Sequence, residues 1–203
     1  MAEVVKIDSL EGFESLKEGW NDLLAQSEFD SIFMIHEWLS TWWQVYGSDH
    51  ELYILAARKN NSIIGLAPLM RTEESGGKVI RFIGTPNADY CDFLGKDKNE
   101  IISSILSYLG QHNDEWDSIE FSQIPEISSS CKILESLAKE MLLLYRMKVI
   151  ETCHVFRYDG GEEGRKDFSL KRGTSLKRFI NFFTKMDGLS LEHYQDADKI
   201  ASL

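Results

Sequence analysis

Two aspartates and a tyrosine stand within four positions of one another, at Asp89, Tyr90 and Asp92. A carboxylate can deprotonate or orient an amine or hydroxyl group within hydrogen-bond reach, and a phenol can donate a proton or offer a stacking surface. The three residues are therefore a candidate catalytic site. The alternative is structural: Asp89 caps a turn, and Asp92 alternates outward from the apolar Phe93.

A second candidate group stands at the start of a helix predicted over residues 35–46, where Glu37 is close to Trp38 and Trp42. Glu37 is a further catalytic candidate, and the two tryptophans are candidates for lining a substrate cleft. Both features also have a simpler explanation. The helix macrodipole favours a glutamate in the first turn, and aromatic residues at helical spacing usually face a core.

A third candidate is the basic stretch between positions 165 and 185, which holds seven Lys or Arg residues and one acidic residue. We expect Lys177 and Arg178, in this stretch, to contact the phosphates of a substrate, a CoA tail or RNA. The simpler explanation is a solvated helix face that balances the acidic remainder of the chain.

Several other kinds of site are not indicated. The histidines show no metal-ligand spacing, so no metal site is predicted. Cys91, Cys131 and Cys153 form no Cys-x-x-Cys pair and are interpreted as reduced thiols. The phrases typical of hydrolases, P-loop proteins and dinucleotide-binding proteins do not occur.

The elements that position these candidates can be predicted from hydrophobic periodicity. Residues 4–7 predict a short strand, and Asp8 and Glu11 have the spacing of a capping box at a helix start. Apolar residues then recur at intervals of three and four along one predicted helix: Phe13, Leu16, Trp20, Leu23 and Leu24. The helix over residues 35–46 shows the same periodicity.

The middle of the chain predicts an antiparallel meander with strands at 51–58, 62–70 and 78–83. Asn60 and Asn61 join the first two strands, because asparagine tolerates the positive φ of a tight hairpin.

Asp97 and Glu100 repeat the capping-box spacing ahead of a third helix. Further elements are predicted in the order strand 119–122, helix 133–142 and strand 147–158. A glycine-containing loop at 159–167 is the best linker candidate, followed by helix 174–186 and strand 189–194. The predicted domains are residues 1–158 and, beginning with the linker, an incomplete second unit at 159–203.

The order strand, two helices, meander, helix, strand, helix, strand resembles that of a GNAT-type acyltransferase domain. Four phrases are more specific: FMIHEWLSTWW at 33–43, IIGLAPLM at 63–70, IRFIG at 80–84 and DYCDFL at 89–94. Together they are similar to the GNAT-like acyltransferase family that includes the cellulose-biosynthesis protein CelD and is related to the FemAB aminoacyltransferases. The stretch 175–193 is similar to the basic helix that links the two halves of those proteins.

The resemblance implies an α/β (α+β) protein with a GNAT-like acyl-CoA N-acyltransferase fold, in which helices flank a mixed, mostly antiparallel sheet. It implies acyl or aminoacyl transfer from a thioester donor, such as acetyl-CoA or another acyl-CoA, to an amine or hydroxyl. This chain resembles the N-terminal, acceptor-side half. The catalytic residues so implied are Asp89, Tyr90, Asp92 and Glu37, and the substrate-binding residues are Trp38, Trp42, Lys177 and Arg178.

The junction before the third helix departs from the family pattern. A GNAT cofactor site has a glycine-rich turn here, whose amides hold the pyrophosphate at a helix N-terminus. Residues 95–100 contain one glycine, and Asp97 at the expected cap competes with phosphate for the same amides. We therefore expect a weak acyl-CoA site in this half. The main alternative is a catalytically inactive GNAT-like binding or oligomerisation module.

The net charge of −11 restricts the partners. Residues 1–150 hold 24 acidic and 13 basic residues, which disfavours nucleic acid, because phosphate contacts need a basic face; RNA binding through 165–185 is a third hypothesis. We expect a small-molecule, glycan or peptide acceptor, together with a second copy of the chain or a missing second GNAT half. No membrane-spanning run or secretory signal is visible, which predicts a cytoplasmic protein.

Overall fold

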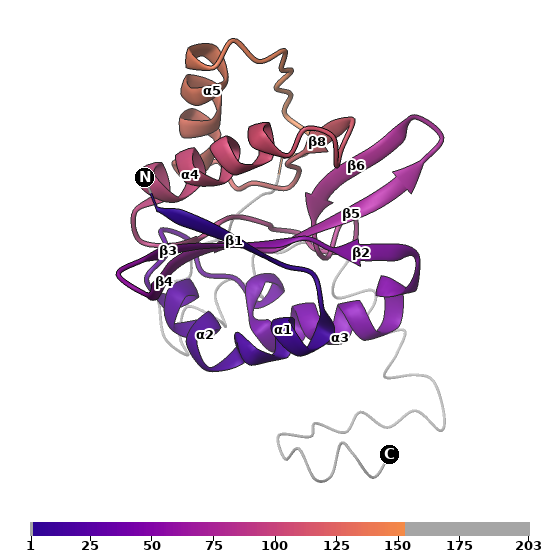
Figure 1. The fold of residues 1–203 in the computed structure, drawn as a ribbon, viewed down its shortest axis with the longest axis vertical. Helices are drawn as coiled ribbons and strands as arrows, with labels where there is room; N and C mark the ends of the chain where they lie inside the picture. Colours follow the sequence, from indigo (N-terminus) through magenta and orange to yellow (C-terminus); the bar gives the residue numbers. More distant parts are fainter. Residues whose placement is uncertain (1, 153–203) are drawn as a thin grey trace, which may run out of the picture. The chain divides into compact units, whose positions relative to one another are not determined.

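The computed structural model describes residues 2–152. These residues fold as a mixed α+β unit in which helices lie on both sides of two mostly antiparallel sheets (Figure 1). The predicted fold class, a mixed and mostly antiparallel sheet flanked by helices, is confirmed. The compact unit extends to Glu151, and the domain boundary predicted at residue 158 lies outside the described residues.

The strands of the described residues form two sheets. The first has the order β1 (Glu3–Ile7), β3 (Ile54–Lys59), β4 (Ser62–Ala67) and β7 (Leu94–Gly95), with all neighbours antiparallel. The second has the order β2 (His50–Leu52), β5 (Leu69–Glu74), β6 (Gly77–Phe82) and β8 (Ser118–Glu120). Strands β6 and β8 are parallel. Parallel neighbours need a long crossover, which here includes a helix.

Two of the predicted strands each contribute to both sheets. The strand predicted at 51–58 divides at Tyr53 into β2 and β3, and the strand predicted at 62–70 divides at Pro68 into β4 and β5. Proline has no backbone N–H and therefore interrupts a strand ladder. The backbone N–H of Tyr53 donates to the carbonyl of Leu69 at 3.0 Å, which keeps the two divided strands together.

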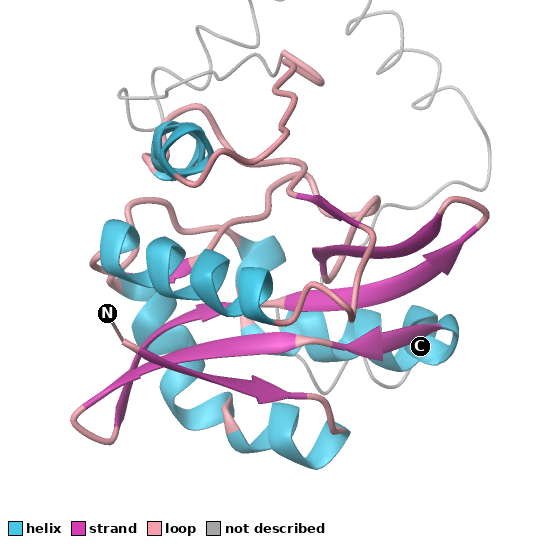
Figure 2. Ribbon diagram, turned by 45° about the horizontal axis from the view of Figure 1, so that its top comes forward, coloured by secondary structure: helices cyan, strands magenta, loops and turns pink. Residues whose placement is uncertain are grey.

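The α-helices of the described residues are α1 (Leu10–Ser15), α2 (Lys17–Ala25), α3 (His36–Tyr46), α4 (Lys98–Gln111) and α5 (Ser130–Glu140). Helices α1 to α3 lie on one side of the sheets, and α4 and α5 lie on the other (Figure 2). Each side buries its own apolar cluster, with Phe13 and Trp20 in one and Ile101 and Ile105 in the other. None of the helices in residues 2–152 is long and apolar enough to cross a membrane.

The first predicted helix differs from the structure in two respects. A turn at Leu16 divides it into α1 and α2, where the Ser15 hydroxyl donates to the carbonyl of Gly12 at 2.7 Å. Serine side chains that bond to the preceding turn compete with regular helical bonding. The cap is Ser9, whose hydroxyl accepts from the Gly12 N–H at 3.1 Å, so the capping box predicted at 8–11 is wrong.

Two other local predictions are confirmed. Asn60 and Asn61 adopt positive φ angles of 49° and 65° in the hairpin between β3 and β4. Asp97 caps α4, and its side chain accepts from the Glu100 N–H at 3.1 Å. The Glu100 carboxylate instead pairs with Lys59 at 2.9 Å. Of the two capping-box residues, only Asp97 therefore caps the helix with its side chain.

Residues 141–152, after α5, form no helix or strand. The strand predicted at 147–158 is therefore wrong over 147–152, and its remainder lies outside the described residues, as do all elements predicted at 159–203. Apolar side chains in 141–152 are exposed, including Leu142 at 91% and Leu144 at 105% of their reference area. A strand is stable only when it pairs with a neighbour, and no described strand pairs with this segment.

Candidate functional site

The post-β6 loop, residues 83–93, carries three of the predicted site residues. Gly84, the second residue of the loop, has a φ of +99°, in the left-handed region that glycine adopts readily. The Thr85 hydroxyl donates to the carbonyl of Phe82 at 2.8 Å, and the peptide bond between Thr85 and Pro86 is cis. The start of the loop is thus tied to the end of β6.

Two tryptophans of α3 hold the post-β6 loop. The Nε1 of Trp42 donates to the Oδ1 of Asn87 at 3.0 Å. A Cβ atom on Gly84 would lie 2.8 Å from the Trp38 ring, so only glycine permits this close approach. Trp38 and Trp42, predicted to bind substrate, therefore lie beside the predicted acceptor loop and fix its position.

Asp89 and Tyr90 are the accessible members of the predicted catalytic trio. Asp89 is exposed, and Tyr90 is half-buried. The Tyr90 ring makes an edge contact with Phe29, with 5.1 Å between the ring centroids. A carboxylate in this position can meet a ligand from solvent and accept a hydrogen bond from it.

Asp92, the third member, is 1% exposed and lies in the interior. Its Oδ2 accepts from the Lys98 ammonium at 2.8 Å and the Ser128 hydroxyl at 2.7 Å. Its Oδ1 accepts from the Ser130 hydroxyl at 2.6 Å and the Phe93 N–H at 2.8 Å. We call Asp92, Lys98, Ser128 and Ser130 the Asp92 cluster. It joins the post-β6 loop to the starts of α4 and α5, and a direct role of Asp92 in proton transfer stays a prediction.

Glu37 is in contact with α2 at the start of α3. The Nδ2 of Asn21 donates to the Glu37 carboxylate at 3.0 Å, and the Oδ1 of Asn21 accepts from the His36 N–H at 3.1 Å. The hydrogen bond from Asn21 lowers the pKa of Glu37. These contacts give Glu37 a part in the helix start, in line with the macrodipole explanation.

The start of α4 does not fit the pyrophosphate of CoA. The Asp97 carboxylate already accepts from the Glu100 N–H, one of the amides that a helix start leaves free. Lys98 is 2% exposed, and its ammonium donates to Asp92 and to the carbonyl of Phe93. Asp97 therefore already occupies one amide of the helix start and Lys98 is paired inside the protein, while competition of Asp97 with a phosphate stays a prediction.

The remaining predictions concern the basic stretch, the metal ligands and the cysteines. Lys177, Arg178 and the rest of the basic stretch at 165–185 lie outside the described residues. Within residues 2–152, no three His, Cys, Asp or Glu side chains are placed to hold a metal ion. Burial raises the pKa of the Cys91 thiol to about 12, so this thiol is unreactive near neutral pH.

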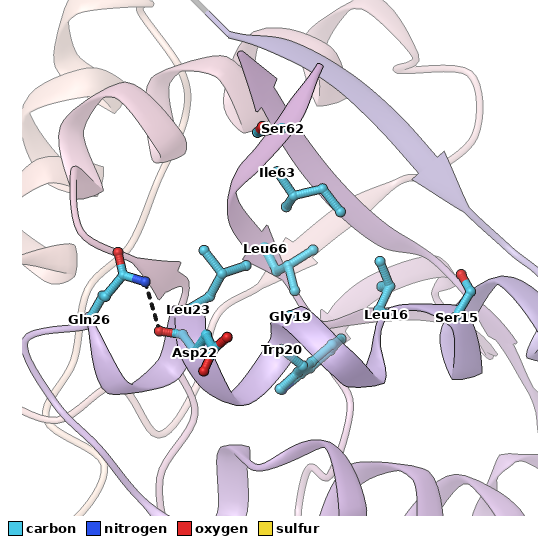
Figure 3. A pocket seen from close by; sticks show the side chains of 10 residues that line it. All are labelled: Ser15, Leu16, Gly19, Trp20, Asp22, Leu23, Gln26, Ser62, Ile63 and Leu66. Carbon is cyan, nitrogen blue, oxygen red and sulfur yellow. Dashed lines mark hydrogen bonds between the residues drawn. The ribbon is translucent and has the colours of Figure 1, made fainter. Parts of the chain in front are cut away.

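An open groove that the sequence analysis missed lies between α2 and β4 (Figure 3), and we call it the α2–β4 groove. Its volume is about 390 Å³. The lining comes from the end of α1, from α2 and its flanking residues, and from β4: Ser15, Leu16, Gly19, Trp20, Asp22, Leu23, Gln26, Ser62, Ile63 and Leu66. None of the predicted site residues is among them. Periodicity assigned Leu23 to a buried stripe, and only the position of β4 shows that it faces an opening.

Comparison with known proteins found no matching protein-family model and no curated protein that matches the sequence. Among solved structures, the chain is similar to a protein described as a probable acetyltransferase, with 13% identity and a TM-score of 0.45 over 78% of this chain and 99% of that chain. It is also similar to an integron cassette protein from the mobile metagenome of V. cholerae, with 11% identity and a TM-score of 0.38 over 83% and 97% of the two chains. Because both sequence identities are below 25% and both TM-scores are below 0.5, neither similarity supports a function for this chain.

Proposed function

We propose that residues 2–152 form the acceptor-side half of a GNAT-like acyltransferase. The observation that carries the proposal is the parallel pair β6 and β8, joined by a crossover through α4 at the end of an otherwise antiparallel arrangement. Apart from the divided first helix, the two divided meander strands and the additional strand β7, the element order through α5 follows the order on which the sequence resemblance rests. This support comes from a similarity of fold and of short sequence segments. A fold alone does not determine a function, which depends on the chemistry of particular residues.

The acceptor would be met by the post-β6 loop. Asp89 is exposed there and can accept the proton that an amine or hydroxyl loses as it bonds to the acyl carbon, while the C–S bond of the thioester breaks and the sulfur leaves as a thiol once protonated. Tyr90 lies next to it, and Trp38 and Trp42 hold the loop against α3. Asp92 acts in this proposal as a positioning residue, because its oxygens are bonded within the Asp92 cluster.

The thioester donor would be bound elsewhere than at the start of α4, where Asp97 already accepts from the Glu100 N–H and Lys98 is paired with Asp92. Lys177 and Arg178 remain the proposed donor contacts. The same observation favours a second candidate function, a catalytically inactive GNAT-like module that binds a partner. The two candidates differ in whether any acyl donor binds.

The test is calorimetric titration of the 203-residue chain with acetyl-CoA and longer acyl-CoAs. It is combined with mass spectrometric detection of acylated product across a panel of amines and hydroxyl compounds. If transfer occurs, Asp89→Asn should lower kcat/KM by about 10²-fold or more, as expected for loss of a general base. The matched control Asp114→Asn removes an exposed aspartate from another loop and should leave transfer unchanged.

Absence of donor binding and of product across the panel would remove the acyltransferase proposal and leave the binding module. If transfer occurs but is unaffected by Asp89→Asn, the acceptor site has been placed on the wrong loop.

A further inference from the structure

We infer that the α2–β4 groove binds a short peptide in extended conformation, one that carries an apolar side chain flanked by Lys or Arg. The peptide would add as a strand to the open edge of β4. This inference is independent of the proposed acyl transfer, because none of the residues assigned to that reaction lines the groove. Three properties of the groove support it.

The first property is unfilled apolar space. A volume of about 390 Å³ lies within the range of ligand pockets, about 300–1,000 Å³. Figure 3 shows Leu23, Ile63 and Leu66 around the opening. A Cβ atom on Gly19 would meet nothing within 4 Å, although glycine inside a helix costs about 0.5–1 kcal/mol relative to alanine. The groove is therefore open at a position where a larger side chain would fit and would also favour the helix.

The second property is an incomplete strand edge. Strand β7 pairs with β4 only at Gly65 and Leu66, and the chain turns away at Gly95, with a φ of +117°, to begin α4. Ser62 and Ile63 consequently have no strand partner on that side among the described residues. Successive residues of an antiparallel strand alternate: one forms backbone hydrogen bonds with the neighbouring strand, and the next points its N–H and C=O away from that strand. One of Ser62 and Ile63 therefore points its N–H and C=O away from β3, toward the open edge of β4. Such an edge can accept a peptide strand.

The third property is the charge beside the opening. Asp22 lines the groove, and Glu18 and Asp22 are both exposed and stand four residues apart on α2, which places them in one row along that helix. Lys17 is the only basic residue between positions 10 and 25. A cationic peptide is complementary to this row. An acidic ligand or a nucleic acid would be repelled, and so would a second copy of the chain that presented the same edge.

The test is a titration of the 203-residue chain, followed by NMR or calorimetry, with a capped peptide of sequence KVLVK. Two related peptides serve as probes: EVLVE reverses the charges, and KVLVK with an N-methylated central residue cannot form the strand bonds. Each should bind at least about tenfold more weakly than KVLVK. On binding of KVLVK, the amide signals that move most should include Ser62 or Ile63.

Two variants test the location. Gly19→Leu fills the groove and should weaken KVLVK binding at least about tenfold, while the Tm stays the same or rises because leucine favours a helix. Gly76→Leu is the matched control, because it places the same side chain in open space in the β5–β6 turn, and it should leave binding unchanged.

The inference is overturned if Gly19→Leu binds KVLVK as tightly as the original chain. It is also overturned if the N-methylated peptide binds equally well, since the groove would then take any apolar cation. Light scattering that shows a dimer dispersed by Gly19→Leu would assign the groove to a second copy of the chain instead.

Discussion

Replacing Lys98 by methionine tests the role of the Asp92 cluster. Asp92 and Lys98 are 1% and 2% exposed, and their charged atoms are 2.8 Å apart. The substitution removes the ammonium but keeps most of the side-chain volume, so it leaves a buried carboxylate with hydroxyl and amide donors only. The ion pair belongs to a network that joins residues 92, 98, 128 and 130, so its loss should affect the folding of the whole unit.

The expected loss is about 3–5 kcal/mol, the cost of removing one partner of a buried ion pair. That is a large fraction of the total stability of a typical domain, about 5–15 kcal/mol. With a urea m value of about 2 kcal/mol per M, the unfolding midpoint should fall by about 2 M. The double variant Asp92→Asn/Lys98→Met carries no buried charge at these two positions and should regain part of the loss.

The assay is urea unfolding followed by tryptophan fluorescence and circular dichroism. Lys59→Met is the matched control, because Lys59 pairs with Glu100 at a similar distance of 2.9 Å but with its side chain 55% exposed; little change is expected there. If Lys98→Met fails to fold, Ser130→Ala removes one hydrogen bond to the same carboxylate and should cost about 1–2 kcal/mol. The reasoning is refuted if Lys98→Met destabilises the protein no more than Lys59→Met does.

Two further predictions concern the sheet edge and the response to acid. Gly95→Ala should cost about 2–4 kcal/mol in urea unfolding, because φ is +117° and the new Cβ would lie 2.4 Å from the Ile64 carbonyl; equal stability of Gly95→Ala and Gly76→Ala would contradict this. The hydrogen bond from Lys6 lowers the pKa of Glu115 below its ordinary value of 4.5, so its contribution to stability is present above that value and is lost as the pH falls through the lowered pKa. The stability difference between the original chain and Glu115→Gln should therefore shrink on acidification, and a difference independent of pH would count against this assignment.

Local features of the fold could be predicted because their causes are local. The helix over residues 35–46 and the cap at Asp97 follow from periodicity and hydrogen bonding within a few residues. The division of the meander into two sheets could not be predicted from periodicity, because the sequence around the two division points, residues 52–57 and 63–70, contains no charged residue. Pro68 was a visible signal for one of the two division points.

The candidate site shows the same contrast. The sequence analysis predicted that Trp38 and Trp42 line a substrate cleft, but it did not predict their contact with the post-β6 loop, which the structure shows. The burial of Asp92 depends on Ser128 and Ser130, which are 36 and 38 residues away and carry no motif of their own. A carboxylate's environment is set by such distant partners, so sequence spacing alone could not separate Asp92 from the exposed Asp89.

The exposed segment after α5 affects how the protein behaves outside dilute solution. From Met141 to Ile150 it presents mostly apolar side chains to water, contains no proline, and holds the charges of Arg146 and Lys148. Such stretches can stack into intermolecular β-structure, and interspersed charges act as gatekeepers against this association. We therefore expect these two cations to oppose aggregation in concentrated preparations.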